Sequence, residues 1–305
     1  MTLNNLSGKR LMIVQAEKGG VGKTTIVDAL AAGLQAINTR VLVVDCDDGN
    51  SGYLRRSGPE GAIPLPWATG PEAAAEWCER HFKENDIIII DCGANLLASA
   101  QPVTKFLGEL ILKVADRGGT IAPIAIASTN APGVDRLVLH MRDTYSAFGK
   151  VCLVQNDQDG SGAFPTSLAT LGLPTARFPY IGPGIMAARL LSRRPLLRTL
   201  QEPPEDYAIA LGYMARHVAR FLETAAISAL LTPAAAQAIH ALSDKAAGHL
   251  EMVVPHLKAA TDSALRANAA CFQTTQNLYR IIKADPGDHA AIAQAAIEWL
   301  EAHTR

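Results

Sequence analysis

The chain has 305 residues, nearly half of them apolar, and a formal net charge of −1. This length allows one large α/β domain with a smaller piece, and the balanced charge excludes a global field that steers the chain to nucleic acid or membrane. The five cysteines are an odd number and form no CxxC spacing, which argues against a disulfide framework or zinc site and indicates a reducing cytosol. We expect no secretory signal and no membrane span, and therefore a cytoplasmic protein.

Short β-branched runs alternate with longer Ala/Leu-rich helical stretches up to about residue 224. The runs are apolar throughout, as expected for strands that are covered on both faces. The predicted strands are Leu11–Ala16, Val41–Asp45, Ile87–Asp91, Ile121–Ala127, Val151–Gln155 and Ala176–Pro179. With helices such as 24–35 as crossovers, the pattern predicts an α/β fold, a mostly parallel sheet with helices on both faces.

The pattern changes after Thr224, because residues 225–305 contain no strand candidate. Apolar positions from Ile239 to Leu257 recur every three or four residues, which indicates a helical stripe. We therefore expect an α/β domain over residues 1–224 and an all-helical extension of two to four helices over residues 225–305.

The segment between the first strand and the first helix has the pattern of a phosphate-binding loop. Glycines let such a loop wrap closely, so that backbone N–H groups and the helix N-terminus point at phosphate oxygens. Lys23 would then reach the β- and γ-phosphates, and the Thr24 hydroxyl would coordinate Mg²⁺. The alternative is a glycine-rich structural turn. The predicted nucleotide-binding residues of this loop are Gly19, Gly20, Val21, Gly22, Lys23, Thr24 and Thr25.

The loop carries a second lysine, Lys18, at its start. This resembles the deviant Walker A loop of the ParA/MinD family of P-loop ATPases, which the nitrogenase iron protein and the arsenite-pump ATPase share. The resemblance covers roughly residues 8–224 and implies the P-loop NTPase fold, ATP and Mg²⁺ as ligands, and a homodimer that forms around nucleotide. In such a dimer Lys18 would reach the partner's phosphates; a solvated loop lysine is the alternative.

Two aspartate-ending strands extend the resemblance. The second predicted strand ends in Asp45-Cys46-Asp47, where the family has Asp-x-Asp. This implies that Asp47 positions the attacking water and that Asp45 lies near the Mg²⁺ shell; a plain Asp-Asp-Gly turn is the alternative. The third strand ends in Asp91, which resembles the Walker B carboxylate that serves the Mg²⁺ water shell.

A weaker part of the resemblance concerns the base. The strand at Val151–Gln155 is followed by Asn156, and in the family an asparagine there reads the adenine edge. A strand-end cap is the alternative interpretation. Pro179 follows the next strand, where the family's loop passes the base.

Four arginines without an intervening acid lie between positions 189 and 198. We predict that Arg189 and Arg193, at positions i and i+4 of a helix, share one face. In ParA-type proteins basic residues in this part bind DNA phosphates without sequence preference, and a dimer would double the patch. The alternative is a solvated face whose arginines pair with acids such as Glu202. The candidate DNA-binding residues are Arg189, Arg193, Arg194 and Arg198.

Together these features predict a slow, Mg²⁺-dependent ATPase that dimerises with ATP and acts in DNA (plasmid) partition, maintenance or transfer. An adaptor protein that stimulates hydrolysis is expected as a partner. Two alternatives remain open. One is a ParA-like positioning ATPase for a protein cargo, and the other is an accessory ATPase that regulates a partner enzyme through residues 225–305.

Overall fold

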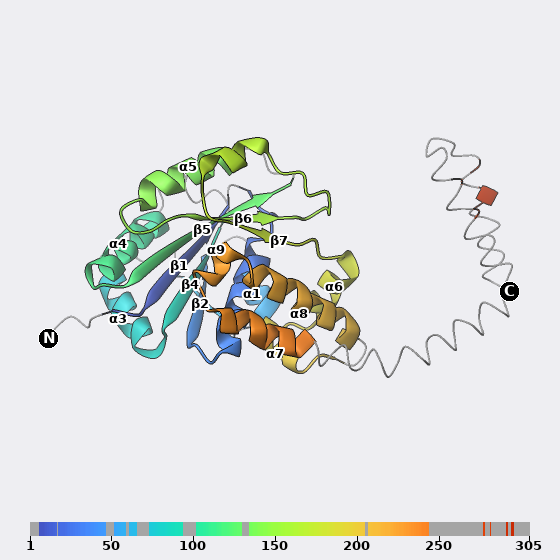
Figure 1. Cartoon of the computed structure of the whole chain (residues 1–305). Helices are drawn as coiled ribbons and strands as arrows, with labels where there is room; N and C mark the ends of the chain where they lie inside the picture. The colour runs from blue at the N-terminus through green and yellow to red at the C-terminus, as the bar shows by residue number, and fades with distance from the viewer. Residues whose placement is uncertain are drawn as a thin grey trace. The chain divides into compact units, whose positions relative to one another are not determined.

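The apolar runs of the sequence form a seven-stranded parallel sheet in the order β3-β2-β4-β1-β5-β6-β7 (Figure 1). Its strands are β1 (Arg10–Gln15), β2 (Val41–Cys46), β3 (Ile63–Pro64), β4 (Ile87–Cys92), β5 (Thr120–Ser128), β6 (Cys152–Asn156) and β7 (Thr175–Phe178). Every strand pair is parallel. Helical crossovers are therefore required between successive strands, because parallel neighbours cannot be joined by a tight turn.

The structure is a computed structural model. It describes residues 6–16, 18–46, 52–58, 61–65, 73–93, 102–129, 134–204 and 207–243, together with 277, 281, 291, 294 and 295. The chain divides into two compact units, Met1–Ala247 and Gly248–Arg305. In the second unit the described residues are helical.

Helices cover both faces of the sheet. Those on one side are α3 (Ala74–Glu84), α4 (Pro102–Asp116) and α5 (Val134–Tyr145) (Figure 1). The other side carries α1 (Lys23–Ala36), α7 (Leu196–Gln201) and α8 (Ala208–Leu222). Shorter elements are α2 (Gly52–Ser57), the 3₁₀ helix η3 (Thr166–Leu171), α6 (Pro183–Leu191) and α9 (Ala225–Ser228).

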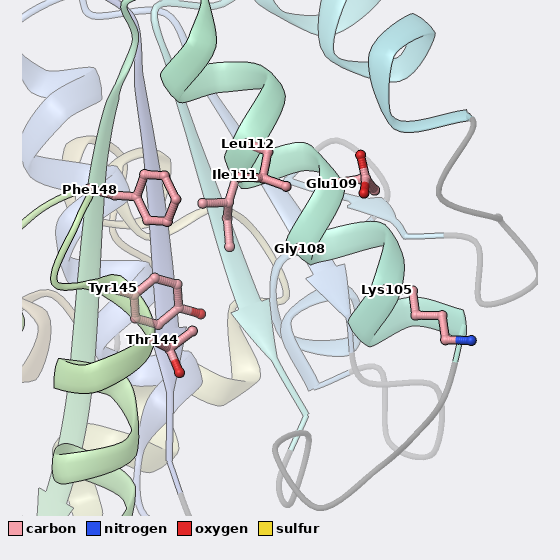
Figure 2. A pocket seen from close by; sticks show the side chains of 8 residues that line it. All are labelled: Lys105, Gly108, Glu109, Ile111, Leu112, Thr144, Tyr145 and Phe148. Atoms are coloured by element: carbon pink, nitrogen blue, oxygen red, sulfur yellow. The ribbon is translucent and has the colours of Figure 1, made fainter.

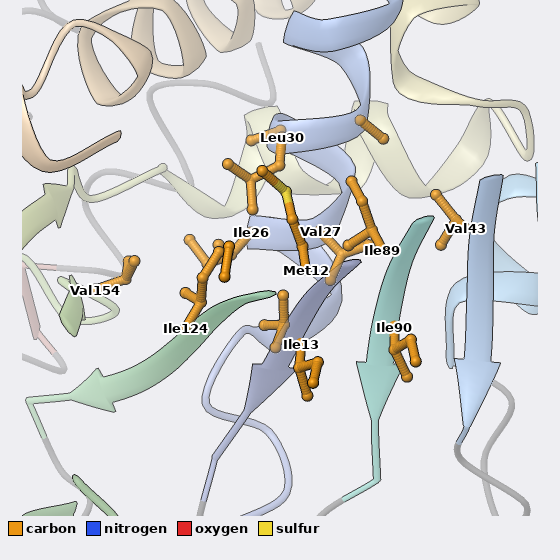
Figure 3. Packing of buried hydrophobic residues seen from close by; sticks show 14 of the residues in the cluster. Met12, Ile13, Ile26, Val27, Leu30, Val43, Ile89, Ile90, Ile124 and Val154 are labelled. Carbon is orange, nitrogen blue, oxygen red and sulfur yellow. The ribbon is translucent and has the colours of Figure 1, made fainter. Parts of the chain in front are cut away.

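The core lies between these layers. Side chains alternate across the strands, so that Met12 and Ile89 point toward α1 while Ile13 and Ile90 point to the other side (Figure 3). All four are fully buried, as is Leu30 of α1. The helix is buried along most of its length, so the loop that precedes it is attached to an element held within the core.

The predicted fold class is confirmed, and each predicted strand is present within one or two residues of its expected bounds. The sequence did not reveal β3, which has only two residues and ends in Pro64. A proline lacks the N–H that a central strand needs, so this position is tolerated because β3 lies at the edge of the sheet.

Residues after Thr224 continue to pack on the sheet domain. The side chains of Ile227, Ala235 and Ile239 are buried in its core, and residues 233–243 are helical. The first compact unit accordingly extends to Ala247, beyond the boundary expected at residue 224. The division into an ATPase domain and a helical extension stays a prediction, and its later helices fall largely outside the described residues.

The hollows on the surface of the first unit include two that described residues line. One, of about 400 Å³, lies between α4 and the end of α5, and Figure 2 shows its apolar wall of Ile111, Leu112 and Phe148 with Lys105 and Glu109 nearby. The second, of about 540 Å³, lies at the amino-terminal ends of β1, β5, β6 and β7 beside α9. Neither hollow shares a residue with the phosphate loop.

Candidate nucleotide-binding site

The predicted site residues converge because the carboxyl ends of all strands lie along one edge of the sheet. Asp45 and Asp91 are direct partners in the β2–β4 register, and β1 lies between β4 and β5. The chain crosses from one side of β1 to the other after β4, which makes the end of β1 a topological switch point. Ligands of open α/β sheets bind in the crevice at such points.

The loop after β1 has the backbone of a phosphate cradle. Gly20 and Gly22 have φ values of 76° and 91°, which glycine adopts without strain. Helix α1 begins directly afterwards at Lys23. A Cβ added at Gly19 or Gly20 would meet no atom within 4 Å, so this side of the loop is open. Open backbone at a helix N-terminus fits a phosphate group.

Two contacts join predicted residues at the loop. The Thr24 hydroxyl donates to Asp91 Oδ2 at 2.8 Å, and Lys23 Nζ lies 3.4 Å from the carbonyl oxygen of Lys18. Lys23 is buried, whereas Lys18 is exposed. An aspartate oxygen beside a threonine hydroxyl is a donor set that suits Mg²⁺, which prefers hard oxygen ligands.

Burial dominates the electrostatics of Asp91. It raises the pKa of this carboxyl to about 7, and the nearby charge of Asp45 acts in the same direction. The hydrogen bond from Thr24 and the charges of Lys23 and Arg56 oppose the rise. The two neighbouring carboxyls therefore form a site in which an added cation would favour the ionised form.

Asp45 and Asp47 lie on the chain leading to α2. Asp45 Oδ2 accepts hydrogen bonds from the backbone N–H groups of Tyr53 and Leu54, at 3.0 and 3.1 Å, and so fixes the start of α2. Arg56 of the same helix donates to the Thr25 hydroxyl at 2.9 Å. Helix α2 is thus joined to α1 next to the loop. Asp47 lies outside the described residues, so its role stays a prediction.

The end of β6 contacts the loop through two side-chain amides. The side-chain amide of Asn156 donates to the Val21 carbonyl at 2.8 Å. Gln158 donates to the Gly20 carbonyl at 2.6 Å and accepts a hydrogen bond from Ser128 at 2.7 Å. The adenine contact of Asn156 stays a prediction.

Pro179 follows β7 at this same edge, and its contact with the base also stays a prediction. The sequence analysis missed Gln158, Ser128 and Arg56. Nothing in the sequence marks them, since their partners lie at least 30 positions away.

The structure corrects one of the arginine predictions. Arg189 is fully buried, and its guanidinium pairs with the equally buried Asp28 of α1 at 2.7 Å. A side chain held inside the core cannot present its charge to DNA. The shared helical face predicted for Arg189 and Arg193 is also wrong, because α6 ends at Leu191 and Arg193 has a positive φ of 47°.

The other three arginines differ in their surroundings. Arg194 donates to the backbone carbonyl of Glu202 at 3.0 Å and lies 3.6 Å from its carboxylate, as the alternative interpretation of this segment expected. Arg193 and Arg198 are exposed. We call Arg193, Arg194 and Arg198 the arginine patch; its contact with DNA stays a prediction.

Other described features concern the cysteines and the helices. Cys46, Cys78, Cys92 and Cys152 are buried thiols that form no disulfide among the described residues. Among the residues that the structure describes, no group of histidine, cysteine and acidic side chains is arranged to hold a metal ion. Within the same part of the chain, none of the helices has both the length and the apolar character needed to cross a membrane.

Comparisons with solved structures return nucleotide-binding proteins. A ParA family ATPase from Chlorobium tepidum has 18% identity and a TM-score of 0.47, over 74% of this chain and 98% of its own. The MinD cell division protein of Aquifex aeolicus has 13% identity and a TM-score of 0.43, over 68% and 97%. The septum site-determining protein MinD of Pyrococcus horikoshii, complexed with Mg-ADP, has 18% identity and a TM-score of 0.43, over 78% and 95%.

The family comparison carries the assignment. No curated protein matches the chain. Residues 12–283, well over half of the chain, match the model of the CobQ/CobB/MinD/ParA nucleotide binding domain (CbiA). This match agrees with the loop, the aspartate-ending strands and the parallel sheet described above. The chain therefore belongs to the CobQ/CobB/MinD/ParA nucleotide-binding family and is a P-loop ATPase of the ParA/MinD type.

Proposed function

We propose that this ATPase is an ATP-dependent dimerising switch that binds DNA without sequence preference and acts in plasmid partition, maintenance or transfer. The observation that carries the proposal is the exposure of Arg193 and Arg198 on a chain whose net charge is only −1. Such a local patch attracts phosphates, and dimerisation doubles it. The binding state of the protein then follows the nucleotide state.

The nucleotide site supplies the switch. Lys23 and the loop N–H groups hold the phosphates, and Thr24 with Asp91 and Asp45 holds Mg²⁺. When bound with Mg²⁺, ATP supplies the phosphoanhydride bond whose hydrolysis gives ADP and phosphate. Asp47 orients the attacking water, and Lys18 reaches the partner protomer's phosphates.

The base lies near Asn156 and Pro179. Turnover is slow, since a switch must persist in its ATP state, and an adaptor protein accelerates it.

The test is a salt titration of duplex DNA binding with ATP, with ADP and without nucleotide. Each arginine that neutralises a phosphate adds about 0.9 to the slope of log affinity against log salt. Arg193→Ala/Arg198→Ala removes up to four contacts from a dimer, so the slope should fall by as much as about 3–4. Wild type should bind most tightly with ATP.

A matched control is Arg136→Ala/Arg142→Ala, which removes two exposed charges from α5 on the opposite face of the sheet. This variant should keep the wild-type slope. Equal affinity in all three nucleotide states, or the same slope in both double variants, would exclude DNA binding through the arginine patch.

A protein cargo is the second candidate, and a specific observation favours it. Leu190 and Leu191 at the end of α6 are 48% and 63% exposed, and Leu191 lies two positions before Arg193. Exposed leucines beside a charge suit a protein partner better than a phosphate backbone. If the titration excludes DNA, substitution of these leucines is the next experiment. The remaining candidate is then an accessory role through residues 225–305, in which the part beyond residue 243 would contact the partner enzyme.

A further inference from the structure

Two side-chain amides of one short segment bind two consecutive carbonyl groups of the phosphate loop. Asn156, the last residue of β6, donates to Val21 O, and Gln158 donates to Gly20 O at 2.6 Å. The segment and the loop are more than 130 positions apart in the sequence. The loop therefore rests on the end of β6 rather than on its own strand and helix alone.

Ser128 and the Gly20 carbonyl together hold the Gln158 amide at both ends. This serine ends β5, is buried, and is the register partner of Asn156. Its hydroxyl donates to Gln158 Oε1 at 2.7 Å, which leaves the NH₂ group of Gln158 directed at Gly20 O. The Gly20 carbonyl can only accept, so it requires the NH₂ group on its side of the amide, and the Ser128 hydroxyl then donates to the oxygen on the other side.

These contacts determine where the loop's N–H groups point. In a planar trans peptide the C=O and the following N–H point in opposite directions. With the carbonyls of Gly20 and Val21 turned toward the end of β6, the N–H groups of Val21 and Gly22 face away from it, toward the open side of the loop. That side is where a phosphate would lie.

The seat is tight. A Cβ added at Gly22 would lie 2.1 Å from Asn156 Nδ2 and 3.6 Å from Gln158 Nε2. The loop backbone is therefore in direct contact with both amides, and a change in either amide acts on the peptides that face the phosphates.

We propose that Gln158, oriented by Ser128, is a positioning residue for phosphate binding, and that it acts with Asn156 by holding the loop's N–H groups toward the phosphates. The inference rests on the proposed ATP-dependent function and deepens it. Gln158, in the segment after β6, would then serve phosphate binding rather than base recognition, because it contacts the loop whose N–H groups face the phosphates.

The experiment compares ATP with inorganic triphosphate, which has no base, by calorimetric titration with Mg²⁺. In Gln158→Ala, the affinities for ATP and triphosphate should fall together, each by about two- to tenfold, as expected for the loss of one hydrogen bond from an exposed side chain. Gln158→Met fills nearly the same space without a donor and should lose affinity equally. Gln155→Ala is the control, because the Gln155 side chain leaves β6 on the face opposite Asn156 and should have no effect.

Three outcomes contradict the inference. If ATP weakens but triphosphate does not, the residue serves the base. If Gln158→Met binds as wild type does, the role is packing and not hydrogen bonding. If both variants keep wild-type affinity with unchanged thermal unfolding, the contact has no function. A wild type that binds neither ligand would instead overturn the proposed function itself, and the inference with it.

Ser128→Ala gives an independent check should the Gln158 variants fail to fold. It leaves both amides in place and removes only the hydroxyl that orients Gln158. Both ligands should weaken in parallel, by less than in Gln158→Ala. Unchanged affinity in this variant would contradict the orienting role of Ser128.

Discussion

Gly22 has two separate reasons to be glycine, and only one of them is local. Its φ of 91° is a conformation that other residues avoid, and the loop motif in the sequence implies such a requirement. The second reason is the Asn156 amide, which occupies the space a Cβ would take. The motif therefore identified the loop correctly. The support from the end of β6 could not be identified, because it depends on which strand ends the fold brings together.

Asp86 provides a pH-dependent prediction at the amino-terminal ends of the strands. Lys9 and Arg40 both donate to this carboxylate, and their hydrogen bonds hold its pKa well below the usual range. A lowered pKa in the folded state stabilises the protein above the unfolded pKa of about 4, and this contribution is lost as the pH falls. The side chain is 36% exposed, so screening limits the contribution to about 1 kcal/mol.

Asp86→Asn should therefore lower the free energy of unfolding at pH 7 by up to about 1 kcal/mol, and the difference from wild type should shrink below about pH 4. Urea unfolding of both proteins at several pH values measures this difference in the free energy of unfolding. Glu76→Gln, which disrupts the more exposed pair of Glu76 with Arg80, should have a smaller effect at every pH. A difference that grows as the pH falls would contradict the argument.

At the scale of elements, the sequence predicted those that depend on local pattern. Residues 87–90 of β4 are a continuous apolar run, and α1 follows a loop whose motif predicts a helix directly after it. It did not predict contacts between distant helices. The sequence pattern predicts that Arg189 is a surface charge beside Arg193. In the structure α6 packs so that Arg189 contacts Asp28 of α1, 161 positions earlier. Charge patterns along a chain do not distinguish a solvated arginine from a paired, buried one.

The buried pair of Arg189 and Asp28 joins α6 to the helix that begins at the phosphate loop. The arginine also donates to Ser192, whose hydroxyl accepts a hydrogen bond from Thr199 of α7. Removing one member leaves a buried charge unpaired, which costs about 3–5 kcal/mol, whereas replacing both can be nearly neutral. Arg189→Met should thus be strongly destabilising, and Asp28→Ala/Arg189→Met should recover most of the loss.

Chemical unfolding of the two single variants and the double variant gives the coupling energy. Arg194→Met is the matched control, because it makes the same substitution in the exposed pair with Glu202 and should cost less than about 1 kcal/mol. Additive effects of Asp28→Ala and Arg189→Met would show that the pair does not stabilise the junction of α1 and α6.

At the scale of the whole molecule, the described contacts place the loop, the two aspartate-ending strands and the segment after β6 at one edge of the sheet. Lys18 is different, because it is exposed at that edge and, among the described contacts, its backbone carbonyl accepts from Lys23. The family resemblance gives its side chain a role across a dimer. A single chain cannot test that role, which is why the sequence and the structure of one protomer leave it as a prediction.

Lys18→Ala should bind ATP with nearly wild-type affinity but dimerise poorly. A charge-assisted contact to phosphate is worth about 1.5–3 kcal/mol, and a symmetric dimer contains two of them. The dimer dissociation constant in ATP should therefore rise by about 100-fold or more. Sedimentation velocity with ATP and Mg²⁺ measures it. Lys150→Ala is the control, since it removes an exposed lysine beside the opposite edge of the sheet, before β6. Wild-type dimerisation of Lys18→Ala would limit the role of this lysine to its own protomer, and loss of ATP binding would place its side chain at the phosphates beside Lys23.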